Sequence, residues 1–168
     1  ILNLHSLSFG EARGARDGLE RKEYIARGGY PELYTGAEAG LWYPSYVATY
    51  LERDVRNVLN VVELQSFNRF LRACALRTAQ TINYANLARD ADVAPNTARK
   101  WLSLLEASSI IVLTDPFFGN RTKRLVKSPK LHFLDTGLAA FLSGFERADG
   151  LFSSALAGAF WESHVVGE

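Results

Sequence analysis

The chain has only one cysteine and contains no methionine. A single cysteine cannot form an internal disulfide, and Cys74 follows the apolar residues Phe70 and Leu71 in an apolar run. We therefore expect a buried structural thiol there, not a nucleophile. The sequence begins with Ile1 and ends in an apolar periodic pattern without a stop signal. We interpret it as a fragment that is truncated at both ends.

Long apolar runs are also missing. The longest, 155–161 and 110–113, are much shorter than the roughly 20 residues that a membrane-spanning helix needs. No charged-then-apolar leader opens the sequence. These absences predict a cytoplasmic protein without a membrane partner. With 48% hydrophobic and 22% charged residues over 168 positions, the chain can bury one core, or one core and a small satellite unit.

Catalytic templates are absent from the sequence as well. No glycine begins a phosphate-binding loop, because none is followed at the required spacing by a Lys-Ser or Lys-Thr pair. The histidines His5, His132 and His164 are far apart and lack the spacing of zinc ligands. His132 lies on a predicted strand, where we expect it to be partly exposed. We expect no complete catalytic site, no metal and no cofactor in this segment.

The net charge is only +1, but the charges are unevenly distributed. Acids and bases balance over 1–76, bases dominate over 77–130, and acids dominate afterwards. The basic residues of the middle block are Arg77, Arg89, Arg99, Lys100, Arg121, Lys123, Arg124, Lys127 and Lys130.

Helical periodicity follows a break at Gly28, Gly29 and Pro31. Apolar residues over 43–55 and 64–79 recur at the i, i+3, i+4, i+7 spacing of a helix with one buried face. The first of these helices is predicted to begin near residue 43, with the proline at 44 in its first turn. The pattern predicts a helical bundle over 28–79.

The middle of the chain changes its period. A short helix over 84–90 and a turn over 91–94 precede a longer helix over 95–108, whose first-turn proline fits the start of a helix. Two short apolar runs, 110–113 and 131–134, then indicate strands that bracket a basic loop. The predicted fold is mainly α, a helical bundle plus a winged helix-turn-helix with a short β-hairpin.

Such a unit can place its second helix in the major groove of DNA while basic residues of the hairpin contact phosphates. The candidate partner is duplex DNA, and the alternative is a protein-interaction scaffold, because a charged helix face is often only solvated and the chain is nearly neutral. The candidate DNA-binding residues are Asn96, Thr97, Arg99 and Lys100 on the second helix and Arg121, Lys123, Arg124 and Lys127 on the wing.

Two polar positions are assigned structural roles. Asp135 stands at a junction between a strand and a helix, and we expect it to cap the helix rather than to act as an acid. Arg53 and Asp54 are expected to form an ion pair or a surface pair rather than an arginine finger.

Several motifs together resemble the DUF4143 domain, which follows an ATPase core of the AAA+ type in many ATP-binding proteins. The motifs that carry the resemblance are Gly28-Gly29-Tyr30-Pro31-Glu32, Tyr50-Leu51-Glu52-Arg53-Asp54-Val55, Trp101-Leu102, Lys127-Ser128-Pro129-Lys130 and Asp135-Thr136-Gly137-Leu138-Ala139. The stretch from Leu4 to Glu11 looks like the end of such a core, although Ser6 stands where a proline is usual. The resemblance implies ATP and magnesium in an upstream domain and no cofactor in this segment.

The resemblance also divides the chain. It implies the end of an ATPase core and a linker over 1–27 and the start of a truncated domain over 143–168, on either side of the bundle over 28–79 and the winged unit over 80–142 that the residue pattern predicts. That last domain is similar to a restriction nuclease in the family, so Glu162 and Glu168 are the positions that such a site could use, and a nuclease-like ATPase is a further alternative. The expected role is a non-catalytic module that couples nucleotide state to a target.

Overall fold

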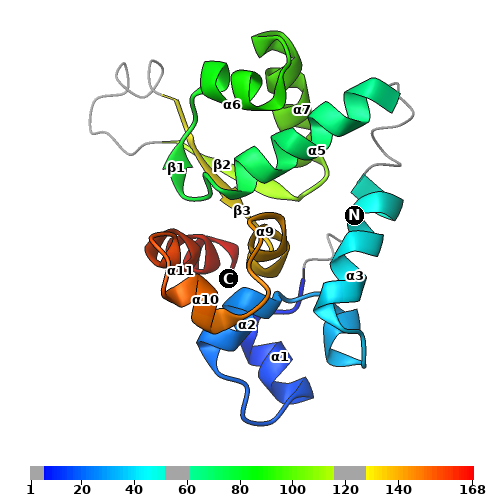
Figure 1. Ribbon diagram of the computed structural model, residues 1–168. Helices are drawn as coiled ribbons and strands as arrows, with labels where there is room; N and C mark the ends of the chain where they lie inside the picture. Colours follow the sequence, from blue (N-terminus) through cyan, green and yellow to red (C-terminus); the bar gives the residue numbers. More distant parts are fainter. Residues whose placement is uncertain (1–5, 52–60, 116–127) are drawn as a thin grey trace.

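A computed structural model describes residues 6–51, 61–115 and 128–168 of the chain. The described part is mainly helical and contains a small three-stranded antiparallel sheet (Figure 1). Its elements are α1 (Phe9–Ala15), α2 (Arg21–Arg27), the 3-10 helix η1 (Pro31–Tyr34), α3 (Ala39–Tyr46), the π-helical turn η2 (Val47–Leu51), α5 (Val61–Ala75), β1 (Gln80–Thr81), α6 (Tyr84–Ala91), α7 (Pro95–Ala107), β2 (Ile111–Thr114), β3 (Lys130–Phe133), α9 (Thr136–Leu142), α10 (Ala148–Phe152) and α11 (Ala157–Gly167).

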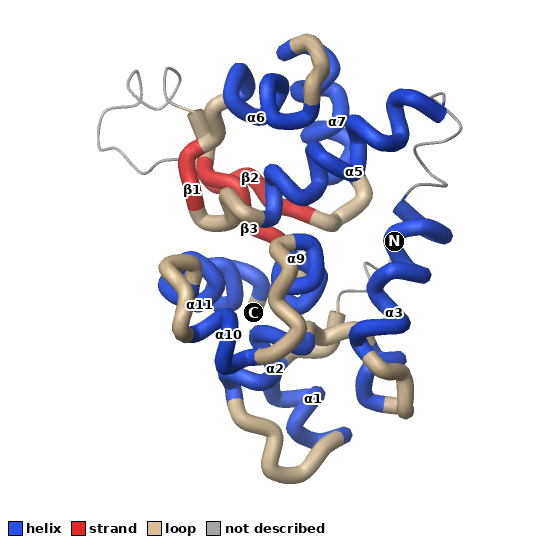
Figure 2. The backbone as a smooth tube through the Cα atoms, viewed as in Figure 1, coloured by secondary structure: helices blue, strands red, loops and turns tan. Residues whose placement is uncertain are grey.

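The sheet has the strand order β1-β3-β2, and it lies between α5, α6 and α7 on one side and α9 and α11 on the other (Figure 2). β2 and β3 pair from Ile111 opposite Phe133 to Thr114 opposite Lys130, which confirms the predicted strands to within one residue. β1 is an addition that the sequence pattern did not indicate. It pairs only two residues with β3, Gln80 with Leu131 and Thr81 with Lys130.

Local capping interactions define the start of α6 and the turn between α6 and α7. The Asn83 side chain caps α6 by accepting a hydrogen bond of 3.0 Å from the Asn86 amide. Asp92 ends the helix in the left-handed conformation with φ 57°, and the Val93 amide donates to the Ala88 carbonyl. Pro95 then occupies the first turn of α7. The two stretches are therefore separate helices, as the sequence predicts.

The core between α5 and α7 is rich in aromatic residues. Trp101 of α7 is almost fully buried and meets the rings of Phe67 and Phe70 of α5 edge-on, at centroid distances of 5.3 and 5.5 Å. Leu102 and Leu105 of α7 are buried beside it. The buried stripe of α7 fixes the rotation of the helix, and so decides which of its side chains face outward.

A second centre, which we call the Asp135 junction, consists of Gly28, Gly29, Tyr43, Asp135 and Gly137. The buried Asp135 carboxylate accepts hydrogen bonds from the amide of Gly29 at 2.8 Å, the amide of Leu138 at 2.8 Å and the hydroxyl of Tyr43 at 3.1 Å. A Cβ atom at Gly137 would overlap the carbonyl of Arg27 and the Tyr43 hydroxyl. The junction therefore joins the end of α2, helix α3 and the start of α9 at close range.

Three predictions of local structure are wrong. α3 begins at Ala39 and not near Tyr43, so Pro44 lies inside the helix. Because proline has no amide hydrogen, the carbonyl of Gly40 lacks its usual helical donor, but Gly40 is an exposed residue. α5 ends at Ala75 rather than at Ala79, because the chain turns there and the Ala79 amide donates to Leu131 of β3. His132 is only 1% exposed, since α11 covers the face of β3 on which it lies.

Helices near the two ends of the described chain pack together. α2 contacts α9, α10 and α11, and the amide of Phe9 donates to the Glu168 carboxylate at 2.8 Å. The predicted segments 1–27 and 143–168 therefore share a contact surface, and the proposed domain boundaries themselves stay predictions. Among the described helices, none combines the length and the apolar character that crossing a membrane requires.

Candidate nucleic-acid interface

The outward face of α7 carries the polar residues that the sequence indicates. Asn96, Arg99, Lys100 and Ser103 are exposed, and Thr97 is half-buried. Because neighbouring residues of an α-helix are rotated by about 100°, Asn96, Lys100 and Ser103 form one outermost row. Four of the predicted DNA-binding residues thus lie together on one helix, with Thr97 at the flank of the exposed face.

The two cations of α7 lack acidic partners in the described part of the chain. The guanidinium of Arg99 instead lies 4.2 Å from the ring centroid of Tyr84, the first residue of α6. On neighbouring elements the situation differs, since Arg77 pairs with Asp90 and Arg69 lies 3.8 Å from Asp92. Arg99 and Lys100 therefore present positive charge to solvent.

The predicted wing residues Arg121, Lys123, Arg124 and Lys127 lie outside the described residues, as do Arg53 and Asp54. The strands that flank this segment are described, and Thr114 of β2 pairs with Lys130 of β3 at the strand ends nearest to it. Lys130 points away from α7, toward α11, where its ammonium lies 2.6 Å from the Glu162 carboxylate. Lys130 therefore does not extend the cationic surface of α7.

Tyr84 is the residue of this surface that sequence analysis missed. Its ring contacts Arg99 across two helices, and periodicity within one helix cannot reveal such a contact. The signal that was available is an aromatic residue directly after an N-cap asparagine, with an arginine on the next helix.

The other candidate residues have structural roles. Asp135 caps α9 through the Leu138 amide, as predicted. Burial raises the pKa of Asp135 above its ordinary value, and the hydrogen bonds from Gly29, Leu138 and Tyr43 act in the opposite direction. Cys74 is fully buried, and burial raises the pKa of its thiol, which disfavours the nucleophilic thiolate. Both assignments agree with the sequence prediction.

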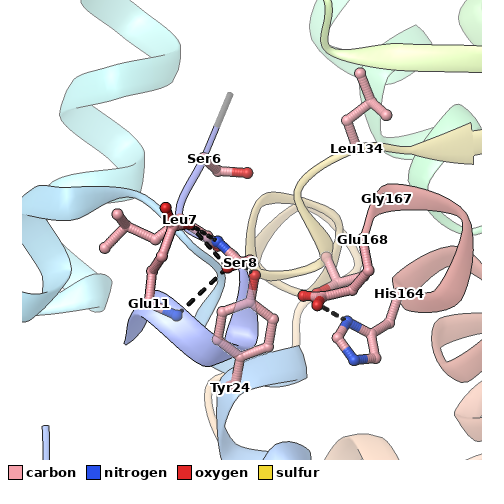
Figure 3. A pocket seen from close by; sticks show the side chains of 10 residues that line it. Ser6, Leu7, Ser8, Glu11, Tyr24, Leu134, His164, Gly167 and Glu168 are labelled. Carbon is pink, nitrogen blue, oxygen red and sulfur yellow. Dashed lines mark hydrogen bonds and ion pairs between the residues drawn. The ribbon is translucent and has the colours of Figure 1, made fainter. Parts of the chain in front are cut away.

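The glutamates considered for a nuclease site are already engaged. Glu162 pairs with Lys130, and the Glu168 carboxylate accepts from the Phe9 amide and lies 3.8 Å from His164. Glu168 and His164 line a cavity of about 210 Å³ between α1, α2 and α11 (Figure 3). Within the described ranges, no group of three or more His, Cys, Asp or Glu side chains is arranged to hold a metal ion. The nuclease expectation stays a prediction.

Two buried histidines attach α11 to the rest of the molecule. His132 contacts the Ser163 hydroxyl at 3.2 Å, and the His164 Nε2 atom lies 3.1 Å from the Arg21 guanidinium. Burial lowers the pKa of both imidazoles. At His132, Glu162 raises the pKa and Lys130 lowers it further. At His164, Glu168 raises the pKa and Arg21 lowers it further. Both side chains are therefore favoured in the neutral form when the protein is folded.

This lowered pKa predicts acid sensitivity. The unfolded chain binds protons at the ordinary histidine pKa, so the free energy of unfolding should be highest above about pH 6.5 and fall as the pH drops below it. Urea unfolding of the wild type and of the His132→Gln/His164→Gln variant measures the effect. We expect the variant to lose less stability than the wild type between about pH 7.5 and 5.5. Parallel pH profiles of the two proteins would contradict the assignment.

Comparison with known proteins places most of the chain in one family. The family model described as "Domain of unknown function (DUF8612)" matches residues 19–149. The resemblance to DUF4143 is therefore wrong, because the matching model is that of a different domain and DUF4143 does not match. The ATPase core before Ile1, with ATP and magnesium, rested on that resemblance and stays an untested prediction.

Two curated relatives are similar over most of the chain. They are the uncharacterized protein Rv2008c of Mycobacterium tuberculosis (strain ATCC 25618 / H37Rv) and the uncharacterized protein Mb2031c of Mycobacterium bovis (strain ATCC BAA-935 / AF2122/97). Each is 33% identical over 143 residues, which is 83% of this chain and 32% of the relative. The chain thus spans about one third of the length of these relatives. No solved structure matches the chain significantly.

Proposed function

Because the chain belongs to the family described as a domain of unknown function (DUF8612), whose description names no activity, we propose a function from the surface of α7. We propose that the elements from α5 to β3 form a winged helix-turn-helix that binds duplex DNA through α7. The segment itself acts as a binding module, not as a catalyst.

The order of the elements supports the winged-helix interpretation. α5, β1, α6, α7, β2 and β3 follow one another along the chain, and β3 lies between β1 and β2 in the sheet. This order is typical of winged helices, in which the helix before the hairpin is the one that enters the major groove. α7 holds that position, directly before β2.

One observation carries the choice of partner. Arg99 and Lys100 are exposed next to each other on the helix that would enter the groove, and neither is paired with an acidic side chain in the described ranges. Phosphates attract unpaired cations, and releasing the counterions of DNA gives most of the affinity of such a contact. Two cations without acidic partners would add less affinity for a folded protein partner, because a charge at the rim of a protein–protein interface contributes little affinity.

The test is binding to a duplex of mixed sequence as a function of salt concentration. Affinity should fall steeply with salt, and Arg99→Ala/Lys100→Ala should lower the slope of log K against log salt by about 0.9 for each of the two residues that contacts a phosphate. Fluorescence anisotropy of a labelled duplex measures both quantities.

The matched control is Arg13→Ala/Lys22→Ala, which removes the same two charges from α1 and α2 on the other side of the sheet. Its slope should equal that of the wild type. Absence of salt-dependent binding, or an equal change in both double variants, overturns the proposal and favours the protein-interaction scaffold instead.

A further inference from the structure

The exposed side chains of α7 do not all lie in the same direction. Asn96, Lys100 and Ser103 follow one another at intervals of four and three residues, which aligns them along the crest of the helix. Arg99 is rotated away from this row by about 60°, toward the flank, because each residue turns the helix by about 100°. The contact with Tyr84 identifies this flank as the one that faces α6.

Tyr84 is well placed to hold Arg99 in that position. The ring belongs to the first turn of α6, is half-buried, and packs against the hydrophobic core of the module. A guanidinium stacked on an aromatic face keeps its N–H groups free at the edge, where they can bind a phosphate in a bidentate manner. The same contact holds the Arg99 side chain away from the crest of α7, and therefore away from the base edges of a DNA groove that α7 would enter.

We infer that α7 divides its contacts with DNA: Tyr84 positions Arg99 on a backbone phosphate, while Asn96 and Lys100 read base edges in the major groove. The inference rests on the proposed function and deepens it, because it names the residues that determine sequence preference. Tyr84 is a positioning residue, since it acts through Arg99.

The chemistry of the crest residues indicates the bases that they recognise. The side-chain amide of asparagine offers one donor and one acceptor, which match N7 and N6 of adenine. The ammonium of lysine offers only donors and fits O6 and N7 of guanine. With one helical turn between Asn96 and Lys100, the preferred site contains an adenine and a guanine at neighbouring positions of the duplex.

Selection from a randomised duplex library, followed by salt titration on the selected site, tests this division of roles. Asn96→Ala and Lys100→Ala should each reduce the preference at one base position by about tenfold. Arg99→Ala should leave the selected sequence unchanged, weaken all duplexes equally, and lower the salt slope by about 0.9.

Variants of Tyr84 provide the matched pair. Tyr84→Phe keeps the ring and should behave like the wild type, whereas Tyr84→Leu should weaken binding about two- to fivefold on every sequence. In the Tyr84→Leu background, Arg99→Ala should have a smaller effect than it has alone. Thermal unfolding of each variant verifies that the module is folded under the conditions of binding.

The outcomes separate this inference from the function on which it rests. A wild-type protein that shows no salt-dependent binding removes the proposed function and the inference with it. Salt-dependent binding in which Asn96→Ala and Lys100→Ala leave base preference unchanged overturns the base-reading role alone. An effect of Arg99→Ala that is the same with Tyr84 and with Leu at position 84 overturns the positioning role alone.

Discussion

Replacing Asp135 by alanine should lower the free energy of unfolding by about 4 kcal/mol, one of the two largest effects that we expect from a single substitution. The carboxylate accepts from the Gly29 amide, the Leu138 amide and the Tyr43 hydroxyl, all within a buried region. Alanine leaves the amides of Gly29 and Leu138 without that acceptor, whereas the Tyr43 hydroxyl can still donate to the Arg27 carbonyl at 2.8 Å. Each buried donor that loses its partner costs roughly 1–3 kcal/mol. Urea unfolding followed by far-ultraviolet circular dichroism measures the loss.

The control for this substitution is Asp135→Asn. Asparagine has nearly the same shape and retains one acceptor oxygen, so it should keep part of the stability that alanine loses. An Asp135→Ala variant within about 1 kcal/mol of the wild type would show that the junction contributes no more than an ordinary surface contact.

The second large effect is expected at Trp101. Truncation to alanine should cost about 3–5 kcal/mol, because it removes a large buried side chain and leaves a cavity beside Phe67 and Phe70. Trp101→Phe keeps an aromatic ring in the same place and should cost less. Thermal and urea unfolding of both variants measure the difference.

Trp101 also separates stability from binding. Its side chain lies on the buried face of α7, whereas Asn96 and Lys100 are exposed. At a temperature where Trp101→Phe is fully folded, its DNA affinity and salt slope should therefore equal those of the wild type. A changed salt slope in the folded variant would mean that the core and the outward face of α7 are coupled.

The helices of the middle of the chain could be predicted because their signals are local. Pro95 at the start of α7 and the buried stripe that includes Trp101 specify both the beginning of that helix and its rotation. β1 could not be predicted in the same way. Gln80 and Thr81 are polar and have no strand pattern of their own, and they form a strand only because β3 offers them an unpaired edge.

The error at His132 has a related cause. Alternation along a strand separates two faces, but it does not say whether the second face meets solvent or another layer. Here α11, more than twenty residues further along the chain, covers that face and brings Ser163 to the imidazole. The sequence of β3 alone therefore cannot predict that α11 covers this face.

Part of the mistaken family assignment relied on residues that packing requires. Gly28, Gly29, Asp135 and Gly137 all belong to the Asp135 junction, where a Cβ atom at each of the three glycines would overlap a neighbouring atom. Close packing between helices accounts for such short motifs, so they indicate local geometry more reliably than family membership. The candidate site does not depend on the family, because Asn96, Arg99 and Lys100 follow from the exposed positions of one amphipathic helix.

The Asp135 junction also has a consequence for how the chain folds during its synthesis. Asp135 is 106 residues after Gly29 and 92 residues after Tyr43, so these hydrogen bonds form only after a long loop has closed. Loop closure costs entropy before such bonds can compensate for it, whereas α6 and α7 contact each other as sequence neighbours. Helices α2 and α3 therefore leave the ribosome long before the carboxylate around which they pack, and the α6–α7 pair can become ordered first.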